Sequence, residues 1–168
     1  MKLFAKWIVG FASVVFLLVF AVMFLNRHSL IWLKGQIKYQ YAESELSYRD
    51  TYIKLIQKEN RDGNTFLIDK AYSSRVYKGS FLYGGEALSF NKTKKIICLL
   101  NDTSAYQWGE FGTFEKTRTI IFYDINESPI GYTLFDEVGE VENYPYRSFM
   151  KWGALSDKGL REMKRLIN

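Results

Sequence analysis

The feature that most constrains this chain is an uncharged run near the N-terminus, IVGFASVVFLLVFAVMFL, from Ile8 to Leu25. Nothing in the run is more polar than Ser13. A bilayer core about 30 Å thick needs roughly 20 residues of α-helix, because each residue advances the helix by about 1.5 Å. A lone strand would leave its backbone groups unsatisfied in lipid. The run therefore predicts a transmembrane helix.

A cleaved signal peptide and a buried helix of a soluble protein are the two alternatives to an anchor. Lys2 and Lys6 resemble the positive region that precedes a signal sequence. A signal sequence, however, has an apolar region of about 7–15 residues and ends in small residues. This run is longer than that, and it ends in the large residues 22–25. We therefore expect an uncleaved, single-pass signal anchor.

The residues that flank the run suit the boundary between membrane and water. Basic side chains and tryptophans are enriched there. The predicted membrane-interface residues are Lys2, Lys6, Trp7, Arg27 and Trp32. Basic residues flank both ends, and a short cationic tail before a first span usually stays in the cytoplasm. We expect the globular part on the extracytoplasmic side.

The chain divides into three parts by composition: the tail and anchor (1–28), an amphipathic helical segment (29–61) and a β-rich domain (62–168). About 143 residues follow the anchor, enough for one domain with its own core. We predict an α+β protein with an N-terminal transmembrane helix, an amphipathic helix, a small antiparallel β-sheet and a C-terminal helix.

Segment 29–60 shows helical periodicity. Its apolar stripe consists of Leu30, Leu33, Ile37, Tyr41, Tyr48, Tyr52, Leu55 and Ile56. One interpretation is a coiled-coil stalk that forms a homodimer; the other is a helix docked on the following sheet. Tyrosine at three stripe positions packs poorly in a coiled coil, which favours docking.

From Thr65 onward, β-branched and aromatic residues alternate with turn residues. The predicted strands span residues 65–72, 75–83, 87–90, 95–100, 113–123, 130–135 and 140–144. Short turns between them predict antiparallel pairing. Residues 156–168 form the predicted terminal helix, with Ser156 as its N-cap and the sheet beneath its apolar face. Cys98, the single cysteine, stands in an apolar run and is expected to be buried.

Catalytic and metal-binding patterns are scarce. The one histidine, His28, stands beside the apolar run, so Ser-His-Asp, Cys-His and zinc sites have no basis. The stretch 124–128 resembles the start of a calcium loop, but Pro129 and Phe135 occupy positions that an EF-hand gives to Gly and Glu. A turn explains this stretch better. We expect no metal and no cofactor.

The most distinctive feature of the domain is the segment 119–145, which contains six acidic residues and no Lys or Arg. The candidate partner-binding residues are Asp136, Glu137, Glu140, Glu142, Tyr132 and Tyr144. Such a surface suits a protein partner with a basic surface. The alternative is an acidic sheet edge that discourages aggregation.

The net charge of +5 is unevenly distributed: residues 62–145 carry −4 and residues 146–168 carry +4. A nucleic-acid-binding platform would be basic, so we expect no nucleic acid. The leading hypothesis is a non-enzymatic interaction module that presents an acidic, aromatic sheet face to a protein partner at the lipid bilayer. The alternatives are a membrane-bound hydrolase with paired carboxylates and a self-associating stalk protein.

Overall fold

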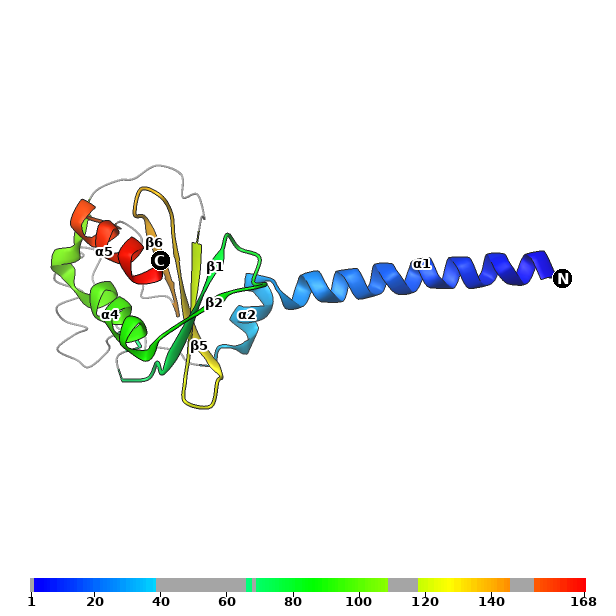
Figure 1. Cartoon of the computed structure of the whole chain (residues 1–168), viewed down its shortest axis with the longest axis horizontal. Coiled ribbons are helices and arrows are strands. Elements are labelled where there is room, and N and C mark those ends of the chain that lie inside the picture. The colour runs from blue at the N-terminus through cyan, green and yellow to red at the C-terminus, as the bar shows by residue number, and fades with distance from the viewer. Residues whose placement is uncertain (1, 39–65, 68, 109–117, 146–152) are drawn as a thin grey trace, which may run out of the picture.

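The computed structural model describes residues 2–38, 66–67, 69–108, 118–145 and 153–168. Within them the fold is α+β, with four α-helices and two antiparallel sheets (Figure 1). The helices are α1 (Lys2–Arg27), α2 (Leu30–Gln36), α4 (Phe90–Asn101) and α5 (Asp157–Ile167), with a 3₁₀ turn, η1, at Thr103–Ala105. The strands are β1 (Ser73–Lys78), β2 (Glu86–Leu88), β3 (Tyr106–Trp108), β4 (Arg118–Tyr123), β5 (Pro129–Phe135), β6 (Val141–Tyr144) and β7 (Gly153–Leu155).

Helix α1 projects away from the rest of the fold as a single rod (Figure 1). Its window Gly10–Arg27 has a mean hydropathy of 2.0, and 0% of that window is buried. The helix is long and apolar enough to cross a bilayer, and a signal sequence would meet the same criteria. The predicted apolar helix is thus confirmed, and its length and composition suit either an anchor or a signal sequence.

Only two residues, His28 and Ser29, separate helix α2 from the end of α1. Ser29 interrupts the helical path and caps α2, since its Oγ accepts a hydrogen bond from the Trp32 N–H at 3.1 Å. The predicted helical segment is confirmed from residue 30 to residue 36. Most of its stripe, from Tyr41 to Ile56, lies outside the described residues.

The main sheet has the strand order β2-β1-β4-β5-β6, and every neighbouring pair is antiparallel, as predicted. Hairpins join β4 to β5 and β5 to β6, whereas β4 returns from elsewhere in the chain to pair with β1. In the β4–β5 turn, Asp124 Oδ1 accepts the N–H groups of Asn126 and Ser128, each at 2.9 Å. Stretch 124–128 is therefore a turn closed by an aspartate.

Strand β4 is buried on both faces, because helices cover both sides of the sheet. Successive side chains of a strand point to opposite faces. Ile120 and Phe122 pack into one cluster with α4 and α5, while Ile121 packs into a second cluster with α2. Helix α2 contributes Leu33 and Ile37 to that second cluster. The described start of the amphipathic segment therefore docks on the sheet.

The segment 95–100 is helical, and its prediction as a strand is wrong. Ser89 caps α4 by accepting the Lys92 N–H, and the apolar run then continues inside the helix. A short apolar run fits a strand and a buried helix equally well by periodicity. Cys98 consequently faces outward on α4, so its predicted burial is also wrong.

Other boundaries differ from prediction at the edges of the fold. The described residues between 66 and 72 form bends and a turn in place of a strand. The loop 79–85 replaces the second half of predicted strand 75–83. Strands β3 and β7, which pair with each other, are three residues long and went unpredicted.

The C-terminal helix is confirmed, including its cap. Ser156 Oγ accepts the Gly159 N–H at 3.3 Å and donates to the Ala105 carbonyl at 3.0 Å. The apolar side of α5, through Met163 and Leu166, closes the cluster beneath α4. The sequence argument that α5 covers the sheet therefore holds.

Leu33, which is 3% exposed on α2, tests whether this helix is docked. We expect Leu33→Ala to lower the free energy of unfolding by about 2–4 kcal/mol, since it leaves a cavity in the core. Ile125→Ala, at a 73% exposed position in the β4–β5 turn, is the control and should change it by less than about 0.5 kcal/mol. Urea denaturation of the detergent-solubilised full chain measures both, and equal effects would contradict the docking of α2.

Candidate functional site: an acidic hairpin and a charged groove

The predicted acidic residues gather at the β5–β6 hairpin, where Asp136 organises the turn. Its Oδ1 accepts three backbone N–H groups, those of Val138 at 3.1 Å, Gly139 at 2.8 Å and Glu140 at 2.9 Å. Gly139 has φ +96°, a conformation that side-chain-bearing residues rarely adopt, and a Cβ there would lie 2.9 Å from the Leu155 carbonyl oxygen. Asp136 is buried, and the turn packs directly against β7.

The two glutamates of this hairpin have different environments. Glu137 is exposed, and its Oε2 lies 3.0 Å from the Lys164 Nζ of α5. Glu140 is buried, and both its loss of hydration and the nearby Asp136 carboxylate raise its pKa. The hairpin thus directs one carboxylate toward α5 and encloses two others.

The two predicted tyrosines lie on the sheet face that α2 covers. Tyr132 and Tyr144 occupy paired positions of β5 and β6, and their rings stack with centroids 5.3 Å apart. The Lys34 Nζ of α2 lies 6.0 Å from the Tyr132 centroid and 5.5 Å from the Tyr144 centroid. This geometry is that of a cation–π contact. Both tyrosines therefore contact α2 through Lys34, and Tyr132 is fully buried.

Glu142 belongs to this second face, because it stands two residues before Tyr144 on β6, opposite Leu134. The six candidate residues are therefore divided between two places. Asp136, Glu137 and Glu140 belong to the hairpin beside α5, whereas Glu142 and the tyrosine pair lie on the sheet face that α2 covers. Their role in binding a partner stays a prediction.

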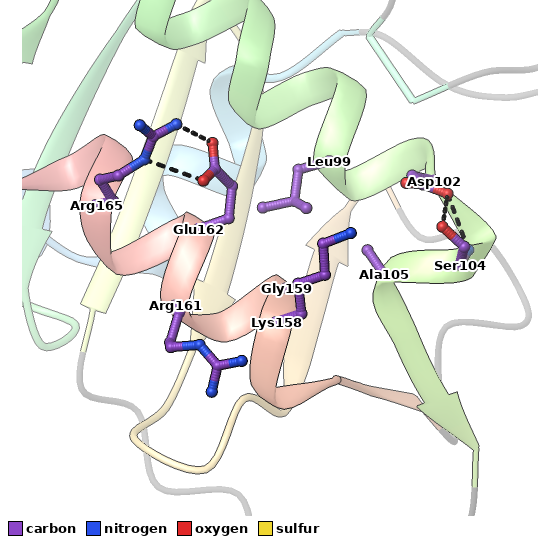
Figure 2. A pocket seen from close by; sticks show the side chains of 9 residues that line it. All are labelled: Leu99, Asp102, Ser104, Ala105, Lys158, Gly159, Arg161, Glu162 and Arg165. Atoms are coloured by element: carbon purple, nitrogen blue, oxygen red, sulfur yellow. Dashed lines mark hydrogen bonds and ion pairs between the residues drawn. The ribbon is translucent and has the colours of Figure 1, made fainter.

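The structure describes a groove of about 410 Å³ between α4, η1 and α5 (Figure 2). Its lining residues are Leu99, Asp102, Ser104, Ala105, Lys158, Gly159, Arg161, Glu162 and Arg165. Close packing shapes it, because a Cβ at position 159 would lie 2.5 Å from the Ala105 carbonyl oxygen. Glycine at this position lets the first turn of α5 approach η1.

The two acidic groups of the groove are engaged within the protein, as the dashed lines in Figure 2 mark. Asp102 Oδ1 accepts the backbone N–H and the hydroxyl of Ser104, at 2.9 and 2.7 Å. Glu162 forms a two-pronged ion pair with Arg165, at 2.7 and 3.0 Å. Lys158 and Arg161 are exposed and form no ion pair within the part of the chain that the structure describes.

A hydrolytic site built from two carboxylates requires that one of them stay protonated, so that it can act as the general acid. Asp102 and Glu162 both line the groove. The hydrogen bonds from Arg165 lower the pKa of Glu162, which favours its charged form. Glu140, whose pKa is raised, lies at the hairpin and is not among the lining residues. The groove suits binding of an anionic group better than acid catalysis.

Metal ligands and membrane-interface residues complete the set of predicted sites. Among the described residues, no group of three His, Cys, Asp or Glu side chains is arranged to hold a metal ion. Lys2, Lys6 and Trp7 lie in the first turns of α1, and Arg27 is its exposed last residue. Trp32 lies on α2, 38% exposed.

Sequence reasoning missed Phe81 and Tyr83, which contact the end of α1 and carry no helical or acidic pattern that would draw attention to them.

Comparisons of this chain with protein-family models, with curated proteins and with solved structures find no match.

The raised pKa of Glu140 predicts a pH dependence of stability. The pKa of Glu140 in the folded protein lies above its pKa in the unfolded chain, which is about 4.3 for Glu. The contribution of Glu140 to stability is therefore complete below the unfolded pKa and is lost as the pH rises through the folded pKa. Glu140→Gln should therefore be more stable than the unchanged protein at pH 7, with a smaller difference at pH 4. Thermal unfolding of both proteins at the two pH values measures this. A difference that grows toward acid would contradict the burial of this carboxylate.

Proposed function

We propose that this protein is a single-pass membrane protein whose domain is a non-enzymatic binding module held at the bilayer surface. The observation that carries the proposal is the junction between α1 and the domain. Helix α1 is apolar and unburied, yet the residue after it is bonded to the domain, since the Leu82 N–H donates to the His28 carbonyl at 2.9 Å. A helix attached in this way suits a permanent anchor better than a signal that is removed.

The surface available to a partner lies at the end of the domain opposite α1. Figure 1 shows α4 and α5 at that end, away from the rod of α1. If α1 crosses the membrane, these helices face away from that bilayer. This placement supports binding of a partner in the surrounding compartment and argues against the basic side of α5 lying on the same membrane.

The exposed charges favour a partner with an acidic surface. Helices α4 and α5 carry seven basic and two acidic side chains. Of the predicted acidic surface, Asp136 and Glu140 are buried and Glu137 already contacts Lys164. We therefore propose the groove, with Lys158 and Arg161, as the binding surface in place of the acidic sheet face. Charge of this kind raises the association rate and selects against wrong partners.

We keep the orientation expected from the sequence, with the N-terminus in the cytoplasm and the domain on the extracytoplasmic side. Self-association through a stalk is less favoured, because Leu33 and Ile37 of its stripe pack within the domain and Leu30 packs against them. The remainder of that stripe lies outside the described residues.

Affinity capture of the full-length protein from its own membranes tests the proposed surface. We expect the double variant Lys158→Gln/Arg161→Gln to retain about tenfold less of the captured partner, a loss that corresponds to roughly 1.4 kcal/mol. The matched control is Glu137→Gln/Glu142→Gln, which removes two charges from the predicted acidic surface and should retain the partner.

The pattern across the two variants decides between the surfaces. Loss of the partner only in the acidic variant would overturn the groove and support the basic partner predicted from the sequence. Equal recovery by both variants and the unchanged protein would reject both surfaces. Absence of any stoichiometric partner in the unchanged protein would contradict a binding module.

A further inference from the structure

Large exposed apolar side chains at and just after the end of α1 come from three separate segments. The rings of Phe24, Phe81 and Tyr83 contact one another, and Ile31 and Trp32 follow the last residue of α1 by four and five positions. We call this set the apolar collar: Phe24 of α1, Ile31 and Trp32 of α2, and Phe81 and Tyr83 of the β1–β2 loop. Their exposed fractions are 37% for Phe24, 81% for Ile31, 38% for Trp32, 41% for Phe81 and 64% for Tyr83. Exposed apolar groups that cluster in this way mark a surface that contacts something other than water.

The loop is held against the helix end by specific contacts. His28 Nδ1 donates to the Leu82 carbonyl at 2.8 Å, and the Leu82 N–H donates back to the His28 carbonyl at 2.9 Å. The His28 ring lies edge-on to both loop aromatics, with centroid distances of 5.7 Å to Phe81 and 5.3 Å to Tyr83. These contacts fix the positions of the two aromatic rings relative to α1.

The height of the collar along α1 follows from helix geometry. Phe24 precedes the last helical residue, Arg27, by three residues, which is about 4.5 Å along the axis. Its ring centroid lies 6.2 Å from that of Phe81 and 5.6 Å from that of Tyr83. The loop aromatics therefore stand beside the last turn of the apolar helix, at the depth where a spanning helix leaves the hydrocarbon.

We propose that the apolar collar lies in the interfacial layer of the bilayer and fixes the tilt and rotation of the domain on the membrane. The inference rests on the proposed function, since it requires α1 to span. Tryptophan and tyrosine prefer this layer because one part of the ring is apolar and the other can hydrogen-bond to water. Arg27, exposed at the end of α1, stands where lipid headgroups would meet it.

Lipid fits this surface better than a protein partner because the collar is continuous with the exposed apolar surface of α1. A bilayer that surrounds α1 must meet Phe24, and the rings in contact with Phe24 then meet the same lipids. Elsewhere, Ile125 and Val138 are exposed apolar residues at the tips of separate hairpins, so they provide matched positions away from the collar.

Site-directed spin labelling of the full chain in phosphatidylcholine–phosphatidylglycerol nanodiscs tests the proposal. Cys98→Ser removes the single native thiol, and one cysteine is then introduced at a time. Tyr83→Cys and Ile31→Cys probe the collar from two different elements, Val138→Cys is the aqueous control and Leu18→Cys probes the centre of α1. Collision with oxygen and with a water-soluble nickel complex reports the depth of each label.

We expect the labels at positions 83 and 31 to collide with oxygen, relative to the nickel complex, more often than the label at position 138 does. The same ratio should be higher still for the label at position 18. The labels at positions 83 and 31 should lie within about 10 Å of the headgroup boundary. If the labels at positions 83 and 31 are as accessible to nickel as the label at position 138, while the label at position 18 lies in lipid, the collar proposal is overturned and the anchor remains. Labels at 83 and 31 shielded from both reagents would overturn it in favour of a protein contact. A label at 18 accessible to nickel would overturn the proposed anchor itself.

Discussion

Burial of β4 on both of its faces is the constraint on which the rest of this structure depends. Ile120 and Phe122 need one apolar cover, and Ile121 needs another on the opposite side. Helices α4 and α5 supply the first, and α2 supplies the second. Because only two residues separate α2 from α1, the second cover also brings the apolar helix to the domain. Packing of the sheet thereby determines where the domain lies relative to α1.

That arrangement gives the two ends of the domain different properties. The end beside α1 carries aromatic rings and reciprocal hydrogen bonds between His28 and Leu82, whereas the opposite end carries the charged groove. This separation supports the proposal of an anchor at one end and a binding surface at the other. The buried Asp136 contributes to the charged end indirectly, because it organises the hairpin whose exposed Glu137 pairs with Lys164 of α5.

The sequence predicted the features that depend on local patterns. The apolar helix, the antiparallel hairpins and the Ser156 cap all come from residues close together in the chain. Segment 95–100 is predicted as a strand, yet it is helical, because periodicity alone cannot separate a short apolar run in a strand from one in a helix. The acidic residues looked like one surface in the sequence. Their division between Asp136 and Glu142 depends on strand register and on α2, which no local pattern reveals.

The most direct test of the account is hydrogen exchange at the Leu82 amide, measured by NMR on the full chain in nanodiscs. This N–H belongs to a loop outside any strand, so its protection depends on its bond to the carbonyl of His28 at the end of α1. If the domain is fixed to its apolar helix, Leu82 exchanges more slowly than an unstructured amide and is protected along with the β4 amides. Exchange of Leu82 at the rate of free coil, while β4 stays protected, would show a domain that moves independently of α1 and would contradict the account.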